Sequence, residues 1–236
     1  MTNIDVAFSG GKDSAAMLLR MIELGEKIDN IYFANTGLEY PEQYKYIKKI
    51  QSEIKRKITF VQPDTTFWIW FYGKWTRGMY EGEMRGFPRI VTHGFCCREL
   101  KVKPMNKIRN TDNTLCLGIA SDEGHRVQKE KNLRYPLMEW GWSEDRCTHY
   151  LKQRKLENPL YKRLSRTGCW LCPKQSMASL KFLYDEHPRM WNHMKKLEKE
   201  SPNGFHPSRD LNELENKWKG QCKLNQYFDE RDFGWR

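Results

Sequence analysis

Short apolar segments alternate with amphipathic segments along the first half of the chain. The segments with the length and composition of buried strands are 4–8, 31–34, 58–61 and 115–120. Residues 13–24 and 41–55 carry apolar side chains at helical spacing, and Gly25 is placed to end the first of these helices. Strands that alternate with helices predict a parallel sheet with right-handed crossovers, which is a doubly wound, Rossmann-like α/β fold.

The second half of the chain is more polar and predominantly helical in its pattern. We expect helices near 143–155, 175–186, 188–200 and 208–218, with prolines between them. This pattern predicts an α/β domain over residues 1–142 and a helical C-terminal region over residues 143–236.

The regular alternation stops between about residues 63 and 95. Aromatic side chains are dense here, from Phe67 to Trp75, and too dense for a solvated loop. Two interpretations stay open: a local core of aromatic side chains, or a substrate lid that stacks on a base.

The composition narrows the class of protein. The chain has 236 residues, 39% of them hydrophobic and 30% charged, and no apolar segment approaches the roughly 18 residues that cross a bilayer. Seven cysteines, an odd number, favour reduced thiols over a disulfide framework. With no signal-peptide pattern at the start, we expect a cytoplasmic protein without membrane association.

The net charge of +11 favours a polyanionic ligand through long-range attraction. No block of five or six like charges occurs, and nucleotide phosphates alone could use part of this charge. A nucleic acid, either DNA or tRNA, is therefore a candidate partner beside a nucleotide.

A glycine-rich turn lies where the first strand passes into the first helix. Its two glycines let the backbone approach an anion, and the helix N-terminus directs N–H groups toward that anion. It is not a Walker A loop, because Val6 stands where that motif needs its first glycine and Asp13 follows the lysine. We predict that the residues binding phosphate are Ser9, Gly10, Gly11, Lys12, Asp13 and Ser14, the last three with catalytic roles.

This turn is similar to the SGGxDS signature of the PP-loop, or N-type, ATP pyrophosphatases. Residues 35–44 are similar to the segment after the second strand in the phosphoadenosine phosphosulfate (PAPS) reductase family. Residues 118–126 resemble that family's Gly-x-Arg-x-x-Glu-Ser-x-x-Arg stretch, with Ala120 and Gly124 replacing the first Arg and the Ser. The resemblance implies an adenine nucleotide alpha hydrolase-like fold that binds ATP with Mg²⁺. The further nucleotide-binding residues it implies are Asn35, Thr36, Gly37, Glu123 and Arg126.

The cysteines include an adjacent pair, Cys96 and Cys97, and a Cys-x-x-Cys turn, Cys169 and Cys172. Four thiolates suit either tetrahedral zinc or an iron–sulfur cluster. Adjacent cysteines favour a cluster, because neighbouring side chains diverge and a cubane offers separate iron atoms. The two pairs also resemble the cluster ligands of adenosine phosphosulfate (APS) reductases, so we expect a [4Fe–4S] cluster, with zinc as the alternative. The cysteines expected to be structural are Cys116, Cys147 and Cys222.

The resemblance implies a function in sulfur chemistry. We expect an ATP pyrophosphatase that adenylates a substrate for sulfur transfer, because cluster-bearing relatives include the pyrophosphatase of DNA phosphorothioation. A nucleic-acid acceptor and a sulfur donor protein would be its partners. The alternative is a sulfonucleotide reductase that releases sulfite, although its tail motif with a nucleophilic cysteine is missing from residues 228–236. A non-catalytic nucleic-acid-binding module is a third interpretation.

Overall fold

The computed structural model describes residues 3–89, 95–206, 208 and 210–229, with the backbone alone from 221 to 229. These residues form two compact units, one built from residues 1–67 and 95–170, the other from 68–94 and 171–236. The expected boundary near residue 142 therefore differs from the boundary at residues 170 and 171 in the structure. Helices that follow residue 142 pack within the first unit as well as in the second.

The first unit contains a five-stranded sheet in the order β3-β2-β1-β4-β5, and every neighbouring pair is parallel. The strands are β1 (Ile4–Ala7), β2 (Ile28–Ala34), β3 (Thr59–Val61), β4 (Thr114–Leu117) and β5 (Leu133–Arg134). The parallel sheet confirms the predicted fold class. Strand β5 was not predicted, because two residues are too short to give a periodic signal.

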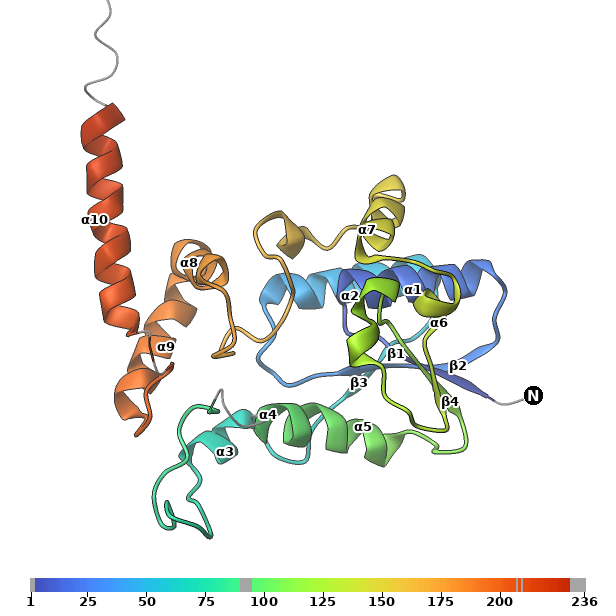
Figure 1. Ribbon diagram of the computed structural model, residues 1–236, viewed down its shortest axis with the longest axis horizontal. Coiled ribbons are helices and arrows are strands. Elements are labelled where there is room, and N and C mark those ends of the chain that lie inside the picture. Colours follow the sequence, from blue (N-terminus) through green and yellow to red (C-terminus); the bar gives the residue numbers. More distant parts are fainter. Residues whose placement is uncertain (1–2, 90–94, 207, 209, 230–236) are drawn as a thin grey trace, which may run out of the picture. The chain divides into compact units, whose positions relative to one another are not determined.

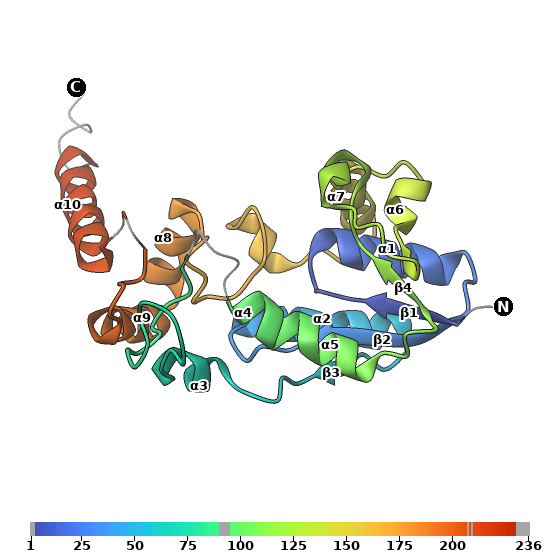
Figure 2. The ribbon, with the colours of Figure 1, turned by 60° about the horizontal axis from the view of Figure 1, so that its bottom comes forward.

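Helices cover both faces of the sheet (Figures 1 and 2). Helices α1 (Lys12–Glu23) and α2 (Pro41–Ile54) lie on one face, and α7 (Glu144–Gln153) packs against α1. Helix α5 (Lys103–Ile108) contacts β2 and β3 from the other face. The chain thus winds outward from β1 through β2 to β3 and then returns to β4. This reversal makes the β1–β4 junction the topological switch point, where ligands of open α/β sheets bind.

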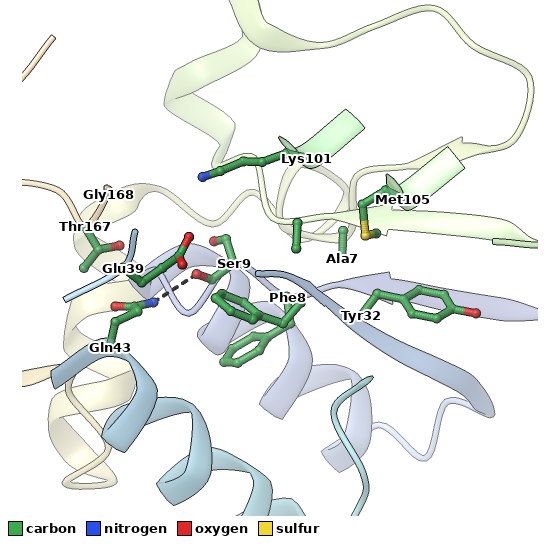
Figure 3. A pocket seen from close by; sticks show the side chains of 12 residues that line it. Ala7, Phe8, Ser9, Tyr32, Glu39, Gln43, Lys101, Met105, Thr167 and Gly168 are labelled. Carbon is green, nitrogen blue, oxygen red and sulfur yellow. Dashed lines mark hydrogen bonds between the residues drawn. The ribbon is translucent and has the colours of Figure 1, made fainter. Parts of the chain in front are cut away.

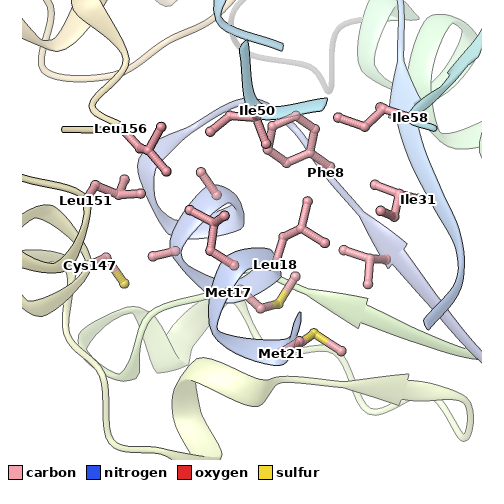
Figure 4. Close-up of a cluster of buried hydrophobic side chains, with 14 of the residues drawn as sticks. Phe8, Met17, Leu18, Met21, Ile31, Ile50, Ile58, Cys147, Leu151 and Leu156 are labelled. Carbon is pink, nitrogen blue, oxygen red and sulfur yellow. The ribbon is translucent and has the colours of Figure 1, made fainter. Parts of the chain in front are cut away.

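The core of the first unit forms around α1 (Figure 4). Met17 and Leu18 of this helix are fully buried, and Phe8 and Ile31 meet them from the sheet side. This burial removes most of the apolar surface of α1 from water, so packing fixes the position of its first turn.

Shorter elements connect these layers and were only partly predicted. They are α4 (Phe95–Cys97), the π-helix η1 (Arg98–Val102), the 3₁₀-helices η2 (Ser121–Arg126) and η3 (Pro159–Lys162), and α6 (Pro136–Glu139). Strand β4 ends at Leu117 and leads through Gly118 into η2, so the predicted strand to residue 120 is too long.

The second unit contains helices and part of the aromatic segment. Its helices are α8 (Met177–Glu186), α9 (Pro188–Glu200), α10 (Leu211–Asp229) and α3 (Phe67–Tyr72), of which Phe67 alone is counted with the first unit. Phe71 and Phe87 are buried, and the Phe87 ring meets Phe205 edge-on at 5.2 Å between ring centroids. These contacts favour the local aromatic core over the lid. No helix in the described ranges is both long and apolar enough to cross a lipid bilayer.

Candidate nucleotide site

The glycine-rich turn adopts a conformation that depends on Gly10. Its φ of +72° lies in the left-handed region, and a Cβ at this position would lie 2.0 Å from Gln43 Nε2. Gln43 Nε2 donates to Ser9 O at 3.0 Å, and Asn158 Nδ2 donates to Gly10 O at 3.0 Å. Two loop carbonyls are therefore held by side-chain amides, so they do not oppose an anion in front of the loop.

The hydroxyl groups of the loop are organised around Ser14, which is buried in the first turn of α1. Ser14 Oγ donates to Gly11 O at 3.0 Å and lies 2.9 Å from Ser9 Oγ. The Ser9 N–H in turn donates to Ser14 Oγ at 3.2 Å. Both ends of the loop are thus joined through one hydroxyl, which keeps the turn compact.

Gly118, directly after β4, allows the end of this strand to lie against the loop. A Cβ on Gly118 would lie 2.7 Å from both the Cα and the N of Ser14. Only glycine permits this approach, because the obstructing atoms belong to backbone that cannot rotate away.

Charged side chains converge beside the loop. Lys12 forms ion pairs with Glu144 and, at 3.4 Å, with Asp13. Carboxylate oxygens of Asp13, Glu123 and Glu144 all lie within 4.8 Å of one another. Arg126 pairs with Glu123 at 2.6 Å. This arrangement combines an acidic cluster with a cationic group, which is the charge pattern of a site for a metal-bound anion.

Burial and pairing shift the protonation of two loop residues. Burial raises the pKa of Asp13 above its ordinary value, and the nearby Lys12 ammonium offsets this only in part. Burial alone would lower the pKa of Lys12, but its hydrogen bond to Glu144 and the charge of Asp13 outweigh that effect and raise it. Lys12 is therefore fully charged at neutral pH.

The loop faces a cavity at the switch point. Its lining residues are Ser9, Gly11, Lys12, Asp13, Ser14, Gly118, Glu123, Arg126, Glu144, Tyr161, Ser165, Arg166 and Thr167. The structure thus gathers at one cavity the predicted loop residues except Gly10, together with Glu123 and Arg126.

A second cavity adjoins the first and is more apolar (Figure 3). Ala7, Ala34 and Met105 are among its apolar lining residues, and Lys101 reaches toward it from η1. Ser9 and Thr167 line both cavities. The two cavities are therefore neighbours, one polar and charged and the other more apolar.

The predicted residues Asn35, Thr36 and Gly37 do not line either cavity. Their segment instead forms a turn after β2 that organises its own side chains. Thr36 Oγ1 donates to Glu39 Oε1 at 2.6 Å, and the Tyr44 hydroxyl donates to Asn35 Oδ1 at 2.7 Å. Burial and the neighbouring Glu39 carboxylate raise the pKa of Tyr44, so its hydroxyl stays protonated as a donor.

The same turn positions Cys169. Glu39 and Cys169 form an antiparallel backbone bridge, the Trp170 N–H donates to Leu38 O at 3.0 Å, and Thr36 Oγ1 lies 3.5 Å from Cys169 Sγ. The first cysteine of the Cys-x-x-Cys turn is thereby fixed at the sheet edge that carries the nucleotide cavities.

The other predicted metal ligands are distributed over both units. Cys96 and Cys97 belong to α4 in the first unit, where Cys96 is half-buried and Cys97 exposed. Cys172 is half-buried and belongs to the second unit. The four sulfurs are therefore not brought together within one unit.

Cys116 and Cys147 are buried in the core, as expected for structural cysteines. Burial raises the pKa of each thiol to about 12, so neither is a ready thiolate ligand at neutral pH. The side chain of Cys222 lies outside the described residues.

The sequence alone did not reveal several residues of this site. They are Gln43, Gly118, Glu144, Asn158 and Tyr161. Tyr161 accepts a hydrogen bond from the Lys12 N–H at 3.1 Å, although the two residues are far apart in the chain. Only Gly118 and Gln43 lay in segments with a family resemblance, and nothing in the local sequence around the other three indicates contact with the loop.

The fold and the site define a nucleotide-binding α/β protein with a phosphate loop at its switch point. The chain belongs to the phosphoadenosine phosphosulfate reductase domain family, whose profile matches residues 3–175. This membership confirms the family indicated by the motifs.

Two curated relatives come from Methanocaldococcus jannaschii. The uncharacterized protein MJ0066 is 28% identical over 204 residues, which is 79% of this chain and 39% of the relative. The uncharacterized protein MJ0973 is 22% identical over 204 residues, which is 80% of this chain and 46% of the relative. The chain thus spans less than half the length of either relative.

A solved structure shows the same fold. The phosphoadenylyl-sulfate (PAPS) reductase from Candida auris, in a phosphate complex, matches with a TM-score of 0.53 and 14% identity. The match covers 72% of this chain and 82% of the reductase. The U34-tRNA thiolase NcsA from Methanococcus maripaludis, with its [4Fe-4S] cluster, gives a TM-score of 0.45 and 16% identity over 92% of this chain and 72% of the thiolase. That second similarity is too weak to support an inference.

We predict that Gly118→Ala lowers the affinity for adenine nucleotide by about tenfold to a hundredfold, because the new Cβ displaces the loop backbone at Ser14. Isothermal titration with ATP measures this. Gly124→Ala is the matched control, since its Cβ would meet only Met138 Cε, at 3.8 Å. Equal affinities in the two variants would contradict the role assigned to the close approach.

Proposed function

We propose that this chain is an ATP pyrophosphatase that adenylates a substrate and prepares it for sulfur transfer. The observation that carries the proposal is the cluster of Asp13, Glu123 and Glu144 beside a complete phosphate loop. Three carboxylates would repel a bare anion. With a divalent cation bound between them, they would instead attract the polyphosphate of ATP, so the cluster favours Mg²⁺–ATP as the ligand.

The adjacency of the two cavities supports an orientation of the nucleotide. The more apolar cavity would take the adenine ring, and the charged cavity would take the phosphates. Ser9 and Thr167, which line both, would then lie near the α-phosphate. Asn35, Thr36 and Gly37 would act indirectly, through the turn that holds Glu39 and Cys169.

The proposed reaction has two steps. A substrate oxygen attacks the α-phosphorus, the bond to the bridging oxygen of the β-phosphate breaks, and pyrophosphate leaves with the electron pair. Sulfide from a sulfur donor would then attack the atom that carries the adenylated oxygen, and AMP would depart with that oxygen and the electron pair of the broken bond. Lys12 and the backbone N–H groups of the loop would stabilise the charge that develops on pyrophosphate, while Asp13 would hold the cation.

The donor set fits a metal centre for the second step. Cys96, Cys97, Cys169 and Cys172 are the described cysteines with accessible side chains, whereas the two core cysteines are buried. We propose that these four hold a [4Fe–4S] cluster, which would supply iron to bind the sulfur that is transferred. Such a centre needs reduced thiols, and a reducing, cytoplasmic location is part of the proposal.

We predict that anaerobically purified protein is brown, contains about four iron atoms per chain, and shows broad visible absorption. Cys169→Ala should abolish the colour because it removes a ligand, and Cys116→Ala should keep it because that thiol lies in the core. Metal analysis and absorption spectra measure both. A colourless wild-type protein with one tightly bound zinc ion would refute the cluster.

We predict that the protein with Mg²⁺ releases pyrophosphate from ATP, in the presence of an acceptor if one is required, and releases no sulfite from APS or PAPS. Asp13→Asn should lower the rate by about a hundredfold or more, because it removes a charge that holds the cation. Asp112→Asn removes the same charge from an exposed turn and should have no effect. The assay measures pyrophosphate and sulfite separately under anaerobic conditions.

Sulfite release with a thiol donor, together with no pyrophosphate from ATP, would identify a sulfonucleotide reductase instead. If neither ATP nor a sulfonucleotide is turned over, even when nucleic acid is added, the non-catalytic binding module would be favoured.

A further inference from the structure

The first unit has a second concave surface, apart from the loop cavity, that is rich in lysine. We call it the lysine groove. Its lysines come from three helices and one turn: Lys45 and Lys49 on α2, Lys152 on α7, Lys155 in the following turn and Lys162 on η3. All five side chains are exposed, and the groove contains a single carboxylate, Glu157. The surface therefore concentrates positive charge far beyond the average of the chain.

This charge is not neutralised by neighbouring acidic side chains. The salt bridges found among the described residues include none of the five lysines. Two acidic residues on the adjoining helices pair elsewhere, Glu144 with Lys12 and Glu23 with Arg154. Lys49 Nζ donates to Lys155 O at 2.8 Å, a contact that leaves its charge intact. Like charges held this close repel one another, and a polyanion would relieve the repulsion.

Lys155 adopts a backbone conformation that is unfavourable for lysine. Its φ of 55° lies in the left-handed region, which glycine adopts without strain and lysine does not. Lys55 at the end of α2 has the same conformation, so it reflects how these helices end, and the case for the groove rests on its charge.

The groove leads toward the phosphate loop. Thr148, Asn158 and Tyr161 line both the lysine groove and a narrower cavity that also contains Lys12. Tyr161 reaches further, into the loop cavity, and accepts the hydrogen bond from the Lys12 N–H. A long anionic ligand in the groove would thus have one of its parts at the site of adenylation.

We propose that the lysine groove binds the phosphodiester backbone of a nucleic-acid acceptor and guides one of its nucleotides to the phosphate loop. That this nucleic acid is the acceptor rests on the proposed function, whereas its binding to the lysine groove does not. Lysines are mobile point charges that suit backbone phosphates and do not read base edges. Binding should therefore depend strongly on salt and little on sequence.

The test is fluorescence anisotropy of the full chain with labelled bulk tRNA and with single-stranded DNA of equal length, without ATP. The triple variant Lys45→Gln, Lys152→Gln, Lys155→Gly should bind about tenfold or more weakly, and the slope of log affinity against log salt should fall by about 2. Lys155→Gly alone should lower the slope by about 0.7, while its melting temperature stays equal or rises.

Lys55→Gly provides a matched control. Lys55 is exposed and has a φ of 51°, so this change removes the same charge and the same strain, but the residue lies outside the groove. Its affinity and salt slope should equal those of the wild type. A preference for tRNA or for DNA would identify the acceptor class.

The proposal is overturned if the wild type binds neither nucleic acid, if the triple variant binds as tightly as the wild type, or if Lys55→Gly weakens binding equally. Pyrophosphate release is measured separately. A protein that binds nucleic acid through the groove but never releases pyrophosphate would keep this inference and refute the proposed function.

Discussion

The geometry of the candidate site depends on the close approach of the carboxyl ends of β1 and β4 at the switch point. Gly118 after β4 touches the backbone of Ser14, and Gly10 turns the chain between β1 and α1 in a conformation that other residues resist. The amides of Gln43 and Asn158 then fix the loop carbonyls. Because α1 is buried from Ser14 to Leu19, the loop at its start is anchored to the core.

The charge pattern follows from that geometry. With Ser14 held against Gly118, Asp13 on the first turn of α1 meets Glu123 from η2 and Glu144 from α7. Lys12 is shared between Asp13 and Glu144, which keeps it charged and extended beside the loop. A cation bound by the carboxylates would release Lys12 toward phosphate. Ligand binding would therefore exchange one set of ion pairs for another without rearranging the backbone.

The sequence predicted the parts of this arrangement that are local. The alternation of strands and helices identified the fold, and Ser9 to Ser14 identified the loop, because both signals lie within a few neighbouring residues. Contacts between distant segments were not predictable. Tyr161 and Asn158 reach the loop from η3, and Glu144 reaches Lys12 from α7, through packing that has no local sequence signature. The family resemblance assigned Asn35 to Gly37 to the nucleotide, which stays a prediction, while the Thr36 hydroxyl contacts Glu39 and lies beside Cys169.

The central claim is that the acidic cluster and the loop together form a site for a metal-bound polyphosphate. Isothermal titration of the protein with ATP, with Mg²⁺ and then with EDTA, tests it most directly. We predict tight binding of ATP in the presence of Mg²⁺. Removing the cation should lower the affinity at least about tenfold, because Asp13, Glu123 and Glu144 then repel the phosphates. Equal affinity with and without the cation would contradict it.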